Sequence, residues 1–289
     1  MTPGPNHRLH ALLDDLQCGS DGIWSAKMPI SEQETEKNLR EKVATGHQGD
    51  YLKHIALHHS ISVMDSEVAR FLDRLPPDSS VLDVGGCWGW HWRNLRDRPE
   101  VLVVIVDFVR ANLIHAKNLL GPLVGNQVAL VHADALQLPF KNKLFDGIWT
   151  VQTFQHIIDF RQACREAYRV LKFEGRFINY SLQTTPCVEF IYRLVGKSYH
   201  KRGNYRNLFH LTRASDEQRN ILEQVFYSPI IDRYTECLFH PDLRLTFSGK
   251  PGSWTGLIDV RLSKIPSIAC KFARQRSFEV VKGIKISES

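Results

Sequence analysis

Short apolar runs alternate with amphipathic stretches through the middle of the chain. The runs occupy residues 81–84, 101–106, 128–131, 145–151 and 177–182. Each run is nearly continuous and rich in β-branched or aromatic residues, which is typical of a parallel strand buried on both faces. Between the runs, apolar residues recur at helical spacing over 113–120 and 163–171. The alternation predicts an α/β fold with a doubly wound, Rossmann-like and mostly parallel sheet.

The flanking regions divide the chain into four predicted parts. Apolar residues at helical spacing predict a helical N-terminal cover over residues 1–75, which Pro76 and Pro77 end. The α/β core follows over 76–182. Residues 183–227 hold scattered Pro and Gly with many aromatics, and we interpret them as an inserted lid. Residues 228–289, with strand candidates at 230–239 and 278–281, would complete the sheet with strands and a helix.

Composition indicates an ordinary soluble globular protein. The chain is 43% hydrophobic and 24% charged, and no apolar run approaches the ~20 residues that span a bilayer. Its first residues lack the apolar segment of a signal peptide, which favours the cytoplasm. None of the six cysteines is at metal-ligand spacing from another, so we expect reduced thiols and no metal site.

Positive charge is concentrated near the C-terminus. Residues 191–289 hold 17 Lys and Arg against 9 Asp and Glu, whereas residues 1–190 hold 20 against 22. Such an excess suits an anionic substrate, a nucleic acid or an acidic membrane surface, and it is equally typical of a solvated basic face.

A glycine-rich turn follows the first apolar run. Residues 83–89 read DVGGCWG, so an acidic residue ends the predicted strand and glycines let the backbone approach a ligand closely. The dinucleotide fingerprint requires glycine at the third and sixth positions of the turn, where this chain has Cys87 and Trp90. NAD is therefore disfavoured. A carboxylate at this place suits an ammonium group instead, such as that of the methionine part of S-adenosylmethionine (SAM).

Acidic residues end three successive predicted strands, at Asp83, Asp107 and Asp134. One such residue is commonplace as the N-cap of the next helix, but three in a row are hard to explain by capping alone. In a doubly wound sheet they meet at the carboxyl edge, where ligands bind. A carboxylate only accepts hydrogen bonds, so it can hold a cis-diol or an exocyclic amine, and adenosine offers both.

The sequence resembles the class I SAM-dependent methyltransferases of the small-molecule type over about 110 residues, from Ser79 to Leu182. Residues 83–89 are similar to the D-x-G-x-G-x-G turn of that family, with Cys87 in place of the middle glycine. A cysteine there fits if its φ stays below zero. Residues 145–157 (FDGIWTVQTFQHI) and 166–176 (EAYRVLKFEGR) are similar to the family's passage from the fourth strand to the fifth.

The resemblance implies a set of cofactor contacts. The methionine end of SAM would lie against Asp83, Gly85, Gly86, Gly89 and Gln152.

The adenosine would contact the ends of the next two strands. Asp107 would accept from both ribose hydroxyls, with Phe108 beside the adenine. Asp134 would accept from the adenine amino group, and Ala135 would supply a backbone contact.

His156 is the candidate general base, because it follows the fourth strand near the expected acceptor and an imidazole titrates near neutrality. A purely structural role for His156 in its loop is the alternative. Methyl transfer needs no base if the acceptor is already a good nucleophile.

We expect a methyltransferase acting on a small-molecule, sugar or lipid-linked acceptor bound between the lid, the N-terminal helices and the loop after residue 151. Two alternatives stay open: a non-catalytic module that binds SAM or a nucleoside, and an RNA methyltransferase that uses the basic C-terminal third. Residues 152–155 (QTFQ) lack the proline-containing tetrapeptide of base-amino methyltransferases, which makes a nucleic acid less favoured. Residues 255–269 mix apolar and basic residues, so they predict either peripheral membrane contact or a helix packed on the sheet.

Overall fold

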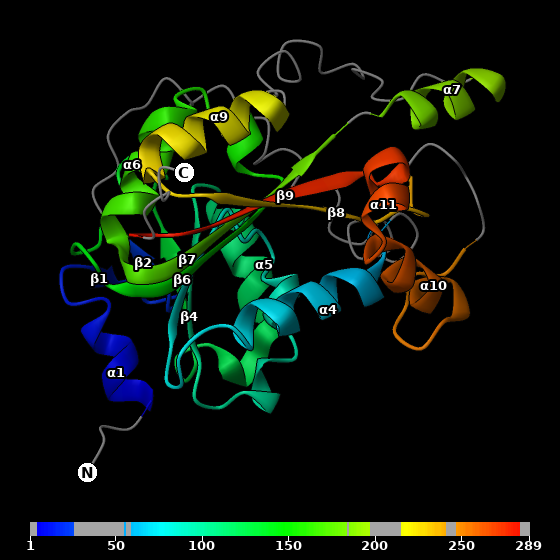
Figure 1. Ribbon diagram of the computed structural model, residues 1–289. Helices are drawn as coiled ribbons and strands as arrows, with labels where there is room; N and C mark the ends of the chain where they lie inside the picture. Colours follow the sequence, from blue (N-terminus) through cyan, green and yellow to red (C-terminus); the bar gives the residue numbers. More distant parts are fainter. Residues whose placement is uncertain are drawn as a thin grey trace.

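The computed structural model of the protein describes residues 5–25, 55, 59–183, 185–196, 215–240 and 247–283. Within these residues a nine-stranded sheet has the order β1-β2-β5-β4-β3-β6-β7-β9-β8 (Figure 1). Five central strands are parallel: β3 (Ser80–Val84), β4 (Leu102–Asp107), β5 (Val128–His132), β6 (Phe145–Val151) and β7 (Leu171–Leu182). The predicted α/β fold with a mostly parallel sheet is confirmed.

The two edges of the sheet are antiparallel or very short. β9 (Gln275–Val281) pairs antiparallel with β7, and β8 (Ile230–Thr235) pairs antiparallel with β9. At the other edge, β2 (Trp24–Ser25) pairs parallel with β5, and β1 (Gln17–Cys18) pairs antiparallel with β2.

The N-terminal region is helical only in part. It contains α1 (Pro5–Ala11) and α4 (Ile61–Leu72), as the apolar spacing predicts, but β1 and β2 lie between them. Strands of two residues carry no readable alternation, so the sequence could not reveal them. Residues 1–4, 26–54 and 56–58 of the expected cover lie outside the described residues.

Helices cover both faces of the sheet. α6 (Phe160–Val170) and α9 (Ser215–Phe226) lie on one face, where they pack against Leu82 and Val104 in one apolar cluster. α4 and α5 (Arg110–Leu120) lie on the other face, where Val81 and Val103 join a second cluster. Successive residues of β3 and β4 point to opposite clusters, which is why these strands read as unbroken apolar runs.

The inserted lid is shorter than the predicted 183–227. Leu222 is fully buried and the ring of Phe226 lies 5.2 Å from that of Phe177, so α9 belongs to the core. α7 (Pro186–Leu194) is what the structure describes of the remaining insertion, and residues 184 and 197–214 lie outside the described part.

The connection from β3 to β4 contains two 3₁₀ turns, η1 (Trp90–Trp92) and η2 (Leu95–Asp97), where the doubly wound pattern predicts a helix. Two further 3₁₀ turns are η3 (Gly121–Leu123) and η4 (Phe154–His156). The large side chain of Trp92 is almost fully buried and belongs to the same apolar cluster as Val81 and Val103.

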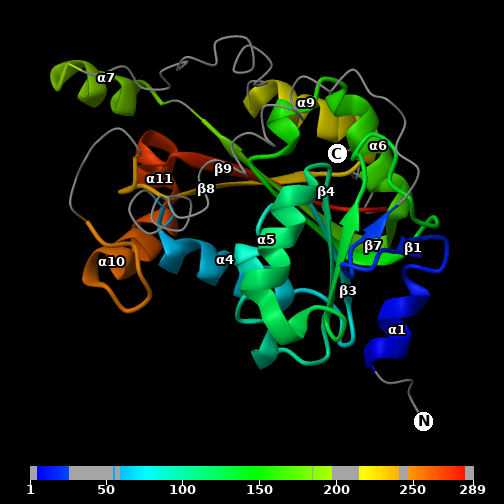
Figure 2. The same cartoon turned by 180° about the vertical axis from the view of Figure 1, so that it is seen from behind.

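The C-terminal passage that the sequence marks as amphipathic forms α10 (Trp254–Ser263) and α11 (Pro266–Phe272). Both helices lie with α7 at one end of the molecule (Figures 1 and 2). Asp259, a residue of α10, is buried, whereas Leu257 of the same helix is 49% exposed. No helix among the described residues has the length and apolar character needed to cross a bilayer.

Candidate functional site

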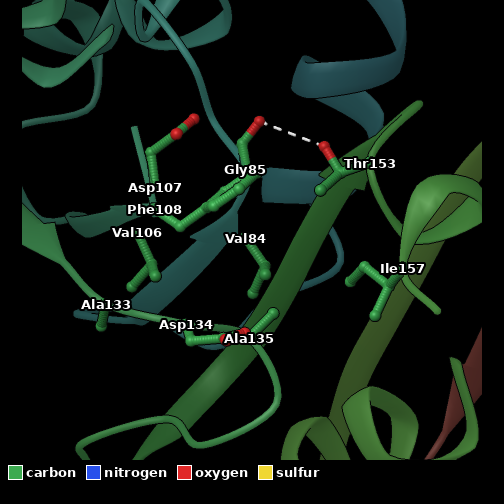
Figure 3. A pocket seen from close by; sticks show the side chains of 10 residues that line it. All are labelled: Val84, Gly85, Val106, Asp107, Phe108, Ala133, Asp134, Ala135, Thr153 and Ile157. Carbon is green, nitrogen blue, oxygen red and sulfur yellow. Dashed lines mark hydrogen bonds between the residues drawn. The ribbon is translucent and has the colours of Figure 1, made fainter. Parts of the chain in front are cut away.

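A pocket opens at the carboxyl ends of β3, β4 and β6 (Figure 3). It is lined by Val84, Gly85, Val106, Asp107, Phe108, Ala133, Asp134, Ala135, Thr153 and Ile157. Its enclosed part measures about 30 Å³, which is room for one edge of a ring. A nucleoside bound here would therefore rest across the strand ends and extend out of the enclosed part.

The turn after β3 is held against the end of β6. Gly85 has φ +72°, a conformation that suits glycine, and a Cβ at Gly85 would collide with the side chain of Thr153. The hydroxyl of Thr153 donates to the carbonyl oxygen of Gly85 at 3.2 Å (Figure 3). Glycine at position 85 therefore allows the segments that follow β3 and β6 to lie in contact.

Cys87 departs from the conformation expected for it. The sequence interpretation required φ below zero, but Cys87 has φ +51° and lies in the left-handed region. Its amide donates to a carboxylate oxygen of Asp107 at 3.0 Å. The backbone at this position thus has the left-handed conformation that glycine adopts readily, and the cysteine side chain makes that conformation strained.

We expect Cys87→Gly to stabilise the protein slightly and Cys87→Val to destabilise it. A non-glycine residue in the left-handed region costs about 1–2 kcal/mol, from which the extra chain entropy of glycine subtracts about 0.5–1 kcal/mol. A β-branched residue fits this region worse than cysteine does, so Cys87→Val should cost about 1–2 kcal/mol. Urea unfolding of both variants measures the difference. Equal destabilisation by both would show that the turn carries no such strain.

Asp107 is buried and organises the turn around it. One carboxylate oxygen accepts from Cys87, and the other accepts from the amide of Val109 at 2.8 Å and from the side chain of Asn112 at 3.3 Å. These three hydrogen bonds fix the carboxylate at the border of the pocket.

Asp134 is buried at the end of β5. One of its carboxylate oxygens accepts from the amide of Leu136 at 2.9 Å, which fixes the side chain beside the pocket. Asp107 and Asp134 therefore border the same small pocket, with Phe108 and Ala135, as the sequence interpretation expected of them.

Asp83 lies behind the pocket lining. Its carboxylate accepts from the indole nitrogen of Trp92 at 2.7 Å. Burial raises the pKa of Asp83 to about 7; the charge of Asp107 adds to the rise, and the Trp92 hydrogen bond opposes it. A nearby cation would stabilise the ionised form of this carboxyl group.

Three other expected contacts shape the turn without lining this pocket. A Cβ at Gly86 would collide with the carboxylate of Asp83, and Gly89 has φ +68°. Gln152 has φ +52°, an uncommon conformation for a side chain of its size, and its amide donates to the carbonyl oxygen of Tyr180.

A hydrogen-bond chain fixes the orientation of His156. The Gln155 side-chain oxygen accepts from the backbone amide of Leu182 at 2.8 Å and from the hydroxyl of Ser181 at 2.9 Å. The Gln155 side-chain nitrogen therefore faces Nε2 of His156, at 3.1 Å. An amide nitrogen only donates, so Nε2 accepts and the neutral ring carries its proton on Nδ1. A general-base role would require His156 to break this bond first.

The sequence interpretation missed five lining residues. Val84, Val106 and Ala133 are direct neighbours of the three acidic residues at the strand ends. Thr153 and Ile157 directly follow Gln152 and His156 in the passage after β6. Adjacency in sequence to a predicted site residue was the available signal.

The topology and the pocket define the class of this protein. Its central strand order β5-β4-β3-β6-β7 reverses at β3, and the ligand edge carries a glycine turn and buried acidic strand ends. This is a Rossmann-like fold with a pocket at its switch point, where sheets of this kind bind ligands.

Comparison with known proteins gives the family. Residues 82–179 match the model of the Methyltransferase domain family. Residues 82–179 therefore carry a domain of the class I SAM-dependent methyltransferases, a family whose cofactor is SAM.

Two relatives illustrate the sequence similarity. Malonyl-(acyl-carrier protein) O-methyltransferase of Geobacter sulfurreducens is 31% identical over 167 residues, which cover 56% of this chain and 61% of that protein. Demethylmenaquinone methyltransferase of Thermus thermophilus is 33% identical over 109 residues, covering 37% and 48%. The chain thus spans about half to three fifths of the length of these relatives.

Solved structures share the fold. A SAM-dependent methyltransferase from Thermotoga maritima has a TM-score of 0.54 at 17% identity, covering 85% of this chain and 99% of that one. Geranyl diphosphate C-methyltransferase from Streptomyces coelicolor, solved with S-adenosylhomocysteine, has a TM-score of 0.50 at 16% identity and covers 75% of each chain.

Proposed function

We propose that the protein transfers a methyl group from SAM to a small-molecule acceptor at the carboxyl edge of β3, β4, β5 and β6. The observation that supports this most directly is the pair of buried carboxylates, Asp107 and Asp134, at one pocket. Asp107 would accept from the ribose hydroxyls and Asp134 from the adenine amino group. Phe108 would lie beside the adenine, and Ala135 would contact it through its backbone.

The methionine end of SAM would lie over the turn after β3. The backbone of Gly85, Gly86 and Gly89 leaves room for it, and Asp83 would face its ammonium group. Gln152 would approach from the end of β6.

SAM supplies an electrophilic methyl group on a sulfonium. The protein's own contribution is to hold the acceptor in line with that group and to exclude water, for which orientation alone is worth up to ~7–11 kcal/mol in model systems.

The acceptor is proposed to be a small molecule, a sugar or a lipid-linked intermediate. The relatives are named for malonyl-(acyl-carrier protein), demethylmenaquinone and sterol substrates, so they favour this class without selecting one member. Among the described arginines of the basic C-terminal third, Arg233, Arg274 and Arg276 each pair with a carboxylate, so these three are less available to an RNA backbone. All six cysteines lie within the described residues and none forms a disulfide, which is compatible with our proposal that the reaction takes place in the cytoplasm.

Calorimetric titration and an acceptor screen together test the function. We expect S-adenosylhomocysteine to bind and NAD not to bind. Radiolabelled SAM is then incubated with a panel that holds malonyl-(acyl-carrier protein), demethylmenaquinone, a sterol and tRNA. Transfer to a small molecule supports the proposal, whereas transfer to tRNA supports the RNA alternative. Binding without any transfer would indicate a non-catalytic module, and failure to bind S-adenosylhomocysteine would refute the cofactor assignment.

We expect His156→Ala to lower turnover by less than about tenfold, with little change in the affinity for S-adenosylhomocysteine. Loss of a general base typically costs about 10²–10⁴-fold, but Nε2 of His156 is engaged by Gln155. The pH profile of kcat/KM should keep its shape in the variant. A loss of 100-fold or more, together with disappearance of a limb of that profile, would establish His156 as the base.

A further inference from the structure

Helices α7, α10 and α11 lie at one end of the molecule, where α11 packs against each of the other two (Figures 1 and 2). A second cavity, of about 360 Å³, is lined by residues from all three helices. Val188 and Ile191 from α7, Leu262 from α10, Phe272 from α11 and Leu238 after β8 form its walls. Its volume is within the range of ligand pockets, about 300–1,000 Å³. The site described above does not use this cavity.

The polar groups in the cavity wall are neutral. Burial raises the pKa of the Cys237 thiol to about 12, and burial lowers the pKa of His240 to about 4. Nε2 of His240 donates to the carbonyl oxygen of Phe272 at 3.1 Å, which fixes the ring in the wall. Asp259 lies behind the wall and accepts from the amides of Cys237 and Leu238. The lining therefore offers no charge to a ligand and suits a hydrocarbon.

Apolar side chains are also exposed on the helices that wall the cavity. We call this set the apolar rim; it comprises Phe190, Leu194, Val195, Trp254, Leu257 and Ile265. Leu194 and Trp254 are each 70% exposed. Exposed apolar groups of this size around an apolar cavity are typical of a binding site.

The cavity and the cofactor pocket lie at the same edge of the sheet. β8 ends at the edge where β6 and β7 end, because β9 pairs antiparallel with both β7 and β8. Neighbouring strands are about 4.8 Å apart, so β8 lies roughly 14 Å from β6, across β7 and β9. The segment that leads from β7 to α7 runs along this edge and is hydrogen-bonded to the residues before β9. The amide of Gln183 donates to the carbonyl oxygen of Arg274, and the hydroxyl of Thr185 donates to the carbonyl oxygen of Lys271.

We propose that this cavity binds the hydrocarbon chain of the methyl acceptor. The proposal rests on the proposed function and narrows its substrate class. The acceptor is an amphipathic molecule whose reacting group lies over the end of β6 and whose chain extends past β7 and β9 into the cavity. Acceptors without such a chain bind weakly.

A series of 1-alkanols from hexanol to dodecanol tests the cavity directly, because these probes are uncharged and differ only in chain length. Binding is followed by methyl NMR of the full chain with labelled Ile, Leu and Val. We expect shifts at Val188, Ile191, Leu238 and Leu262, and a dissociation constant that falls about two- to fourfold per added methylene. The affinity for S-adenosylhomocysteine should change by less than twofold.

Two pairs of variants provide matched controls. Leu262→Trp fills the cavity and should abolish alkanol binding, whereas Arg261→Trp at an exposed position of the same helix should not. If Leu262→Trp fails to fold, Ile191→Trp serves instead, with Arg193→Trp at an exposed position of α7 as its control. For any acceptor that the screen identifies, shortening its chain should raise KM in the wild type and not in the filled variant.

The outcomes separate this proposal from the proposed function. Absence of alkanol binding, binding without dependence on chain length, or unchanged binding in the filled variant would overturn the cavity assignment, even if methyl transfer is found. Equal KM values for long and truncated acceptors in the wild type would overturn it as well. Failure to bind S-adenosylhomocysteine would instead refute the function, whatever the alkanols do.

Discussion

Replacing Asp107 by alanine is expected to weaken the binding of S-adenosylhomocysteine by about 10- to 150-fold. The loss of charge-assisted hydrogen bonds to ribose hydroxyls is worth about 1.5–3 kcal/mol. Trp88 donates its indole hydrogen to Asn112, which in turn donates to Asp107, so tryptophan emission should report the titration. Calorimetry gives the dissociation constant independently.

A control is needed because Asp107 also organises the turn. Asn112→Ala removes one of the hydrogen bonds to Asp107, and Asn112 is not itself among the lining residues. We expect it to lower the thermal midpoint and to change the affinity for S-adenosylhomocysteine by less than about threefold. If Asn112→Ala weakens binding as much as Asp107→Ala does, the carboxylate acts through the shape of the turn and not through the ribose.

Asp83→Asn is expected to stabilise the free protein at pH 8 and to weaken cofactor binding. The pKa of Asp83 is raised to about 7 from an ordinary value of 3.8. A group whose pKa is raised by folding contributes stability below pH 4 and loses it as the pH rises through 7. The wild type therefore keeps a buried carboxylate at pH 8, at a cost on the order of 4 kcal/mol. Asparagine avoids that cost.

Urea unfolding at several pH values measures this effect. The variant and the wild type should have equal free energies of unfolding at pH 4. From pH 4 to pH 8 the variant should become progressively more stable than the wild type. All other titrating groups are shared by the two proteins, so the difference between them isolates Asp83. A constant difference from pH 4 to pH 8 would contradict the raised pKa.

Two ligands then separate the roles of the carboxylates. 5′-Methylthioadenosine lacks the amino acid part of S-adenosylhomocysteine. Asp83→Asn should lower the affinity for S-adenosylhomocysteine by about tenfold or more and change the affinity for 5′-methylthioadenosine by less than about twofold. Asp107→Ala should lower the affinity for both ligands. If Asp83→Asn binds both ligands as the wild type does, Asp83 has no role in cofactor binding and serves only as the hydrogen-bond partner of Trp92.

The sequence predicted the centre of the fold well because the centre is governed by local patterns. Residues buried on both faces of a parallel sheet must be apolar, so β3, β4, β5 and β6 could be located within about one residue. The same pattern located Asp107 and Asp134, which lie where those runs end.

The parts that the sequence did not reveal depend on tertiary contacts. α9 has the composition of a surface insertion, and only the packing of Phe226 on Phe177 shows that it belongs to the core. Cys87 has its positive φ in a folded turn where its amide donates to Asp107, 20 residues further along the chain. The orientation of His156 is set by Leu182, which is 26 residues away along the chain, through Gln155.

The 3₁₀ turns between β3 and β4 give the ligand edge a distinctive local stability. η1 and η2 are held by isolated bonds such as those from Trp92 to Gly89 and from Arg98 to Leu95, whereas a helix would supply a continuous ladder. Amides in such a segment open at a lower free energy than those of the sheet and exchange their hydrogens with solvent sooner. A ligand that contacts the turn removes these open states from the ensemble. If the cofactor contacts the turn as proposed, it supplies part of the order of this segment, and deuterium uptake over residues 85–98 becomes a measure of occupancy that requires no acceptor.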